Sequence, residues 1–226
     1  MKSRLTVSAV ALLGLAAGAL FFTQPERARA VELPNPTADA PKASAPGEEK
    51  AVLAGGCFWG MQLVFEHVKG VKHVTAGYAG GSKETAEYEV VSSGTTGHAE
   101  SVEITFDPSV VSYGQILKVY FGVAHDSTEL NRQGPDEGTQ YRSSIFFENP
   151  DQQQVAKAYI DQLQAAHVYP APIVTTLTPL QAFYPAEDYH QDYAVHHPDN
   201  PYIAFNDLPK LNDLKQDLPD LYVASN

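Results

Sequence analysis

Cysteine is almost absent from this 226-residue chain, and having only one, Cys57, excludes an intramolecular disulfide. A lone cysteine is commonly a small buried apolar residue, so its neighbours decide whether it also reacts. Basic residues are few as well, 15 Lys and Arg against 27 Asp and Glu, which gives a formal net charge of −12 at pH 7. A surface this acidic repels nucleic acid and anionic lipid, so we expect neither as a partner.

A single long apolar run is present, at the N-terminus. Two basic residues precede the run from Val7 to Phe22, and Ala28-Arg29-Ala30 follows with small residues two positions apart. This layout predicts a secretory signal peptide over residues 1–30, cleaved after Ala30. The alternative is an uncleaved membrane anchor, since the run is near the lower length limit for spanning a bilayer. Either reading predicts export, with a bacterial periplasm as the expected location.

Residues 31–48 are rich in Pro, Ala, Thr and Ser, which predicts a flexible linker. The folded domain is therefore expected at residues 49–226. A domain of that length can bury roughly 70% of the surface that its unfolded chain exposes.

Hydrophobic periodicity predicts alternating strands and helices. Residues 100–106 alternate apolar and polar as a half-buried strand does, and residues 113–121 carry apolar side chains at amphipathic-helix spacing. Asn149-Pro150 predicts the start of a helix that runs to about Ala166. The remaining expected elements are strands at 51–54, 71–78, 143–147 and 173–177, and helices at 58–68 and 211–218.

The order of these elements predicts the fold class. Strand, helix, strand, strand, helix, strand indicates an α/β (α+β) fold, a two-layer sandwich with helices packed on one face of a mixed β-sheet. We expect a ferredoxin-like core and an irregular C-terminal tail from Ile203.

Cys57 follows Gly55-Gly56 and directly precedes the first expected helix. The unpaired N–H groups and the positive dipole end at a helix start favour an anion, so they would lower the pKa of the thiol. The two glycines would let the backbone turn sharply and leave the sulfur uncovered. On this pattern alone, the alternative stays equally open that Cys57 merely fills space at a strand–helix junction. Phe58 and Trp59 beside it could line an apolar pocket or simply enter the core.

Five ordered blocks resemble the A class of peptide-methionine sulfoxide reductases. The first, Gly56 to Gly60, reads GCFWG as the signature of that family does. The others are GYAGG at 77–81, GHAE at 97–100 with DP at 107–108, the block from His125 to Ser143 ending in GTQYRS, and AEDYHQ at 186–191. The resemblance covers about Val52 to Pro201, nearly all of the expected domain, and implies an oxidoreductase that repairs oxidised proteins.

The resemblance also implies a role for each site residue. Cys57 would attack the sulfur of a methionine S-sulfoxide, free or in a protein, release methionine and become a sulfenic acid. Glu100 would protonate the sulfoxide oxygen, and its strand parity independently predicts an inward position, where burial raises a carboxyl pKa. The residues implied for substrate binding are Phe58, Trp59, Tyr88, Asp136 and Tyr141. Taken without the resemblance, Tyr88 and Tyr141 could equally be core tyrosines.

Many members of that family carry further cysteines near the C-terminus, which resolve the sulfenic acid, and this chain has none. We therefore expect no bound cofactor and an external thiol, either a thioredoxin-like protein or a small thiol, that reduces Cys57 after each turnover. The expected substrates are oxidised proteins, peptides and free methionine sulfoxide, and the expected state is a monomer. The His- and Asp-containing stretch at 190–199 fits no metal-ligand spacing that we can justify, so we expect no metal.

Two other function classes compete with this hypothesis. Another one-cysteine redox catalyst, such as a peroxidase, would share the sulfenic acid, but it leaves Phe58-Trp59 and the block around Glu100 unexplained. A non-enzymatic exported binding module would use Cys57 structurally and the aromatic residues as a ligand groove.

Overall fold

The structure of the protein is a computed structural model that describes residues 33–224. The signal peptide expected at residues 1–30 lies outside this range. Within it, no helix combines the length and the apolar character that crossing a membrane requires.

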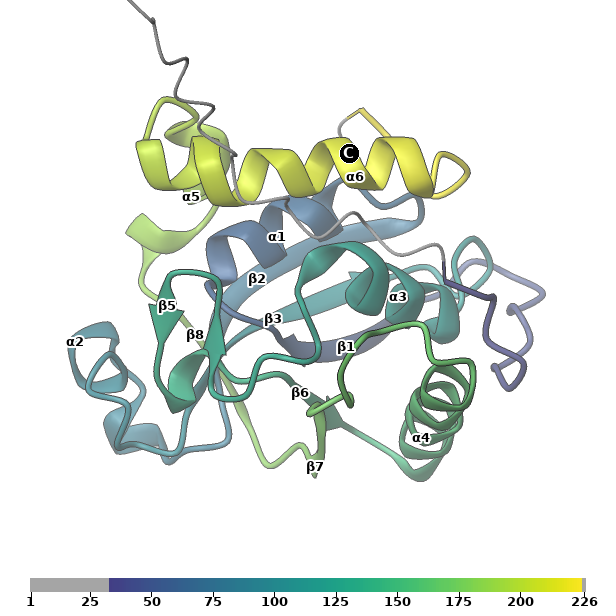
Figure 1. The fold of residues 1–226 in the computed structure, drawn as a ribbon, viewed down its shortest axis with the longest axis horizontal. Helices are drawn as coiled ribbons and strands as arrows, with labels where there is room; N and C mark the ends of the chain where they lie inside the picture. Colours follow the sequence, from purple (N-terminus) through teal and green to yellow (C-terminus); the bar gives the residue numbers. More distant parts are fainter. Residues whose placement is uncertain (1–32, 225–226) are drawn as a thin grey trace, which may run out of the picture.

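A six-stranded β-sheet organises the molecule, with the strand order β7-β6-β1-β3-β2-β8 (Figure 1). Its strands are β1 (Glu49–Ala54), β2 (Val71–Ala79), β3 (Ala99–Phe106), β6 (Ser144–Phe147), β7 (Thr176–Pro179) and β8 (Phe183–Pro185). All neighbours are antiparallel except the parallel pair β6 and β7, so the sheet is mixed. In the centre, β3 is inserted between β1 and β2, the arrangement of a ferredoxin-like core. The expected α+β fold is confirmed.

Six α-helices accompany the sheet in the described part of the chain. They are α1 (Phe58–Glu66), α2 (Tyr88–Val91), α3 (Tyr113–Val119), α4 (Pro150–Ala165), α5 (Tyr193–His196) and α6 (Leu208–Asp217). The start of α4 is as expected, because Asn149 accepts a hydrogen bond from the Gln152 N–H at 2.9 Å. Ser112 and Gln115 form a reciprocal capping box at the start of α3.

Several elements differ from the sequence expectation. The helix expected to end near Phe121 changes to π-helical turns at Tyr120–Ala124. In the tail, the helix expected at 211–218 is present as α6, three residues earlier, and a π-turn at Ile203–Asp207 precedes it. Strand β7 begins three residues later than expected. The short elements β8, α2 and α5 and the hairpin of β4 (Arg132–Gln133) and β5 (Asp136–Glu137) were not expected, because segments of two to four residues carry no periodicity.

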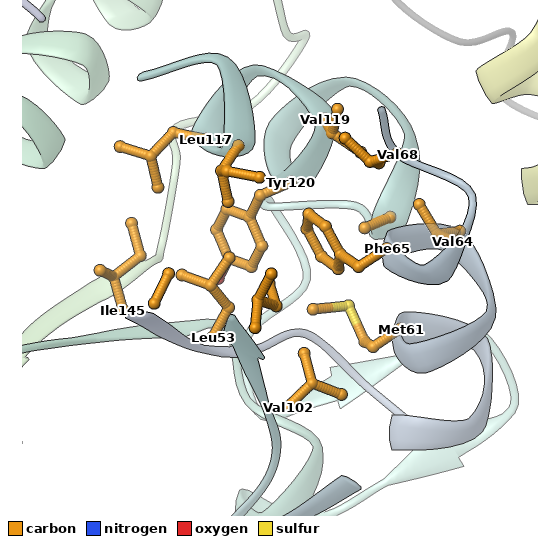
Figure 2. Packing of buried hydrophobic residues seen from close by; sticks show 14 of the residues in the cluster. Leu53, Met61, Val64, Phe65, Val68, Val102, Leu117, Val119, Tyr120 and Ile145 are labelled. Carbon is orange, nitrogen blue, oxygen red and sulfur yellow. The ribbon is translucent and has the colours of Figure 1, made fainter. Parts of the chain in front are cut away.

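The main apolar core lies between one face of the sheet and the helices, as expected for a two-layer sandwich (Figure 2). Met61 and Phe65 of α1 meet Leu53 and Val102 of the sheet, and all four are fully buried. Tyr120 joins them with its hydroxyl satisfied, since it donates to the Ala54 carbonyl at 2.8 Å. Helix α1 is packed along its whole buried face. This packing rigidly sets the position of its first residues, and therefore also that of Cys57, which directly precedes them.

Residues 33–39 lie along α3 and α4 and residues 42–47 contact the loop at 107–110, although the composition of residues 31–48 predicts a flexible linker. The Asp39 carboxylate accepts hydrogen bonds from the Gly114 N–H at 2.9 Å and from the Ser112 hydroxyl, both at the start of α3. The Thr37 N–H donates to Gln162 of α4 at 2.9 Å, and Leu33 is buried. A segment that cannot bury a core of its own thus uses the surface of the adjacent domain.

The docking of this segment predicts a stability effect for Asp39→Ala. Removal of the carboxylate leaves the Gly114 N–H in the first turn of α3 without its acceptor, so we expect a loss of about 1 kcal/mol in the free energy of unfolding. Urea denaturation measures it, and Asp39→Asn, which keeps an acceptor oxygen, serves as the control. An unchanged urea midpoint for Asp39→Ala would contradict the docking of this segment on α3.

Candidate active site

The chain turns sharply between β1 and α1, and Cys57 sits at this turn as the N-cap of α1. Gly56 has φ +89°, in the left-handed region that favours glycine, and a Cβ there would lie 2.6 Å from the Cβ of Gln133. A Cβ on Gly55 would lie 2.7 Å from the ring of His125. Both glycines are therefore required for close packing around the cysteine. They do not leave the sulfur uncovered as expected, because Cys57 is only 8% exposed.

The pKa of Cys57 is raised well above its ordinary value in the protein without substrate. Burial is the main cause, followed by the negative charges of Glu100 and Asp207, and the Trp59 N–H at the start of α1 opposes them. The expectation of a lowered thiol pKa is therefore wrong. The helix start acts in the expected direction, but burial and two carboxylates outweigh it.

Glu100 enters the site from β3 and is 3% exposed. Its Oε2 accepts a hydrogen bond from the Phe58 N–H at 3.0 Å, which leaves the other oxygen to carry a proton. Burial raises the pKa of this carboxyl to about 8, with a smaller contribution from the charge of Asp136. At neutral pH Glu100 is therefore mainly protonated and able to donate. In that state it no longer opposes ionisation of the thiol.

Aromatic rings form a wall beside Cys57. Phe58 is fully buried, with its ring centroid 5.0 Å from that of His190, so it backs the wall from the core side. Trp59 is partly exposed and stacks on Tyr193 with centroids 3.9 Å apart. Tyr202 meets the same indole edge-on at 6.1 Å. The wall thus offers an apolar surface with one exposed indole at its front.

His190 and Glu187 hold this wall in place, and the sequence reasoning assigned no role to either. His190 is 2% exposed, and its Nδ1 accepts a hydrogen bond from Trp59 Nε1 at 3.1 Å. Burial lowers the pKa of His190, so the ring is neutral. Glu187 accepts from the Tyr78 hydroxyl and from the Tyr88 N–H, both at 2.9 Å. The AEDYHQ block that contains Glu187 and His190 was recognised in the sequence, but the sequence does not reveal which side chains these two residues contact.

The remaining expected site residues gather around the same centre. Tyr88 opens α2 and Tyr141 follows the β4–β5 hairpin, and burial together with the charge of Glu100 raises the pKa of both. Asp136 of β5 accepts a hydrogen bond from the Tyr202 hydroxyl. The structure therefore brings all seven expected residues together. No group of three or more metal-binding side chains occurs among residues 33–224.

Asp207 is a further buried carboxylate at this site that the sequence reasoning missed. It is fully buried at the end of the π-turn before α6, and its Oδ1 lies 3.3 Å from Lys210 Nζ. It packs directly against the first turn of α1, where a Cβ on Gly60 would collide with the carboxylate. The last glycine of GCFWG is thus explained by a residue almost 150 positions later.

The family model for peptide methionine sulfoxide reductase matches residues 49–220. The chain belongs to this family. It is an oxidoreductase that reduces methionine sulfoxide, an activity of protein repair. Its relatives include the peptide methionine sulfoxide reductase MsrA 2 of Mesorhizobium japonicum, 63% identical over 79% of this chain and 92% of the relative. The MsrA 2 of Synechocystis is 53% identical over 86% of this chain and 92% of its own length.

Solved structures of the family share the fold. Methionine sulfoxide reductase A of Corynebacterium diphtheriae is 34% identical with a TM-score of 0.57, over 74% of this chain and 85% of that one. Mxr1 from Saccharomyces cerevisiae in reduced form is 29% identical with a TM-score of 0.60, over 70% of this chain and 93% of its own.

The pKa of Glu100 predicts a pH dependence of this reductase. A carboxyl that donates a proton works below its pKa, so the rate of sulfoxide reduction should decline as the pH rises through about 8. In Glu100→Gln we expect a rate lower by about 10²- to 10³-fold at pH 7 and no decline near pH 8. Single-turnover release of methionine between pH 6 and 10 measures both. Glu103→Gln, on the same strand, is the control, and persistence of the decline in Glu100→Gln would remove Glu100 as the donor.

The contact between Gly60 and Asp207 predicts that Gly60→Ala destabilises the protein. Alanine favours a helix by about 1 kcal/mol over glycine, yet the collision should produce a net loss of about 1–3 kcal/mol. Urea denaturation of Gly60→Ala, Asp207→Ala and the double variant measures the coupling. We expect the double variant to lose less than the sum of the single losses, and strictly additive losses would contradict the contact.

Proposed function

We propose that Cys57 reduces the S epimer of methionine sulfoxide, free or within oxidised proteins, by direct attack on the sulfoxide sulfur. The observation that carries this proposal is the position of Glu100, a buried carboxyl that holds its proton at pH 7 beside a buried thiol. A donor next to a nucleophile suits a substrate whose oxygen must be protonated as its bond to sulfur breaks.

The aromatic wall would receive the methyl group of the substrate against Trp59, with Phe58 behind it. The sulfoxide oxygen would then face Glu100, with Tyr88, Tyr141 and Asp136 around it. As the Cys57 sulfur attacks, Glu100 gives its proton to the oxygen and the thiol proton replaces it. The oxygen passes to Cys57, so that a thiol and a sulfoxide become a sulfenic acid and a thioether. The substrate sulfur gains two electrons and the Cys57 sulfur loses two.

An external thiol would restore Cys57, because the chain has no second cysteine. One thiol displaces the hydroxyl of the sulfenic acid as water and forms a mixed disulfide, and a second thiol then releases Cys57. We propose a thioredoxin-like protein as this reductant and no bound cofactor. Since one chain supplies all seven site residues, the proposed working state is a monomer.

We further propose that the protein acts outside the cytoplasm, in the periplasm of a bacterium. The support is the sequence of residues 1–30, with its basic start, apolar run and Ala28-Arg29-Ala30. An exported repair enzyme would meet proteins where oxidants arrive first.

Loss of the nucleophile tests the proposed reaction. We expect the wild-type protein with dithiothreitol to convert the S epimer of a methionine sulfoxide peptide and to leave the R epimer. In Cys57→Ser this conversion should fall below detection, since a hydroxyl cannot form the sulfenic acid. Chromatography of the two epimers measures it. Equal conversion by both proteins would refute the role of Cys57, and peroxide turnover without sulfoxide turnover would favour a peroxidase.

A further inference from the structure

A cavity reaches Cys57 on a face where Tyr202 is the member of the aromatic wall that lines it. This cavity of about 350 Å³ lies between the loop at 121–126, the hairpin region at 129–135 and the segment at 202–213. Neither Glu100 nor any of Phe58, Trp59, Tyr88 and Tyr141 lines it. We call this cavity the rear pocket.

The chemistry of the second half-reaction favours this access to Cys57, provided that the proposed function holds. When a thiolate displaces hydroxide from a sulfenic acid, the entering sulfur and the leaving oxygen lie on roughly opposite sides of the attacked sulfur. The oxygen left on Cys57 comes from a sulfoxide that faced Glu100. The reductant would therefore enter from a side other than that of Glu100, and the rear pocket reaches Cys57 without Glu100 in its lining.

The rim of the rear pocket carries Phe205, which is 78% exposed. It is the most exposed large apolar side chain among the described residues. A small molecule inside the cavity has no need of an aromatic ring that projects into solvent, whereas a protein surface that lies over the rim buries it. The exposed ring therefore favours a protein as the occupant.

The charge of the lining points the same way. Asp126, Glu129 and Asp213 are acidic, Arg132 outside the lining pairs with Glu129 at 3.5 Å, and Lys210 is the single cation among the lining side chains. Lys210 lies 3.3 Å from the buried Asp207, which balances it. The lining carboxylates would repel an anionic small thiol such as glutathione, whereas they would not repel a protein with a neutral or basic surface around its cysteine.

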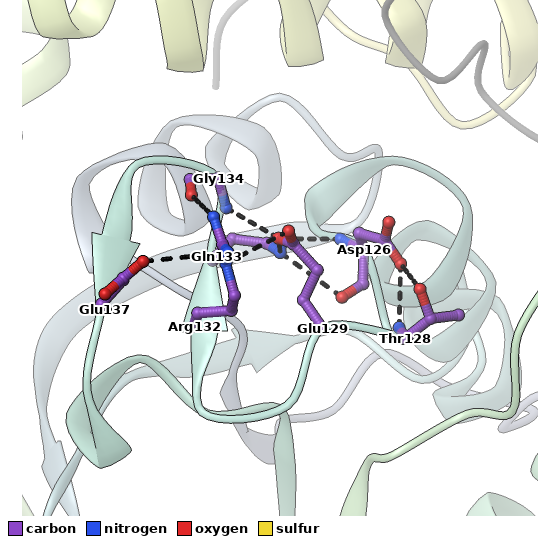
Figure 3. Close-up of polar contacts among 7 residues, drawn as sticks. All are labelled: Asp126, Thr128, Glu129, Arg132, Gln133, Gly134 and Glu137. Atoms are coloured by element: carbon purple, nitrogen blue, oxygen red, sulfur yellow. Dashed lines mark hydrogen bonds and ion pairs between the residues drawn. The ribbon is translucent and has the colours of Figure 1, made fainter.

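One wall of the rear pocket is held in a fixed shape (Figure 3). The Glu129 carboxylate accepts from Gln133 Nε2 and from the Gly134 N–H, both at 2.7 Å, and Gln133 Oε1 accepts from the Asp126 N–H at 2.6 Å. Gln133 also packs on Gly56, directly before the cysteine. The opening is thus preformed, which reduces the entropy lost when a partner binds.

We propose that the rear pocket and Phe205 form the docking surface for a small dithiol protein of the thioredoxin kind. Its first cysteine enters the rear pocket, attacks the Cys57 sulfur and forms a mixed disulfide as the hydroxyl leaves as water. Its second cysteine attacks the partner sulfur of that disulfide, so Cys57 returns as a thiol and the partner leaves oxidised by two electrons.

Steady-state kinetics of the full chain with three reductants test the docking surface. The reductants are thioredoxin with its reductase and NADPH, glutathione, and dithiothreitol, each with a methionine sulfoxide peptide. For Phe205→Ser we expect the KM for thioredoxin to rise about tenfold, with the rate in dithiothreitol unchanged within twofold. Phe205→Trp should keep the wild-type KM. The matched control is Val195→Ser, which removes an apolar side chain 50% exposed on α5 and outside the rear pocket.

Trapping provides a second measurement. Thioredoxin that lacks its second cysteine should form a mixed disulfide with sulfoxide-treated wild type, in lower yield with Phe205→Ser. An unchanged KM and yield in Phe205→Ser would overturn the docking surface, as would an equal loss with glutathione or dithiothreitol. Turnover with dithiothreitol but none with thioredoxin would overturn the docking surface alone, whereas no turnover with any reductant would overturn the proposed function.

Discussion

The hydrogen bond from the Phe58 N–H to Glu100 Oε2 is the contact on which the rest of the site depends. It joins the first residue of α1 to the second residue of β3, so the nucleophile just before α1 and the carboxyl on the sheet have one fixed relation. Burial would otherwise leave the carboxyl without a partner. One N–H satisfies one of its oxygens, and a pKa of about 8 keeps a proton for the other at neutral pH.

The electrostatics of the site follow from this arrangement. Glu100 and Asp207, both almost or completely buried, raise the pKa of Cys57 beyond the effect of its own burial. The raised pKa keeps the thiol protonated at neutral pH. This state protects a lone cysteine from oxidants, because the thiolate is the form that reacts. Protonation of Glu100 removes one of the two charges, so the charge state of this carboxyl also affects the pKa of the thiol.

The sequence predicted features set by neighbours in the chain and missed those set by distant contacts. The alternation in β3 placed Glu100 inward, and Asn149-Pro150 marked the start of α4, since both signals lie within a few residues. The Trp59–His190 hydrogen bond joins residues 131 positions apart, and no local pattern contains it. The pKa of Cys57 was predicted in the wrong direction for the same reason, because the local helix start is outweighed by burial and by the charges of Glu100 and Asp207, which the fold brings from distant parts of the chain.

The single cysteine constrains the geometry of the active site as well as its chemistry. In a chain with a resolving cysteine, one side of the nucleophile serves the substrate and the chain itself supplies the second thiol. Here two separate molecules must reach one sulfur that is only 8% exposed. They arrive in succession, because methionine leaves before the thiol attacks, and the proposed rear pocket would give the thiol a path of its own beside the turn at Gly55-Gly56. This turn places Cys57 beside the loop that Gln133 holds against Gly56, and Tyr202 joins the rear pocket to the aromatic wall.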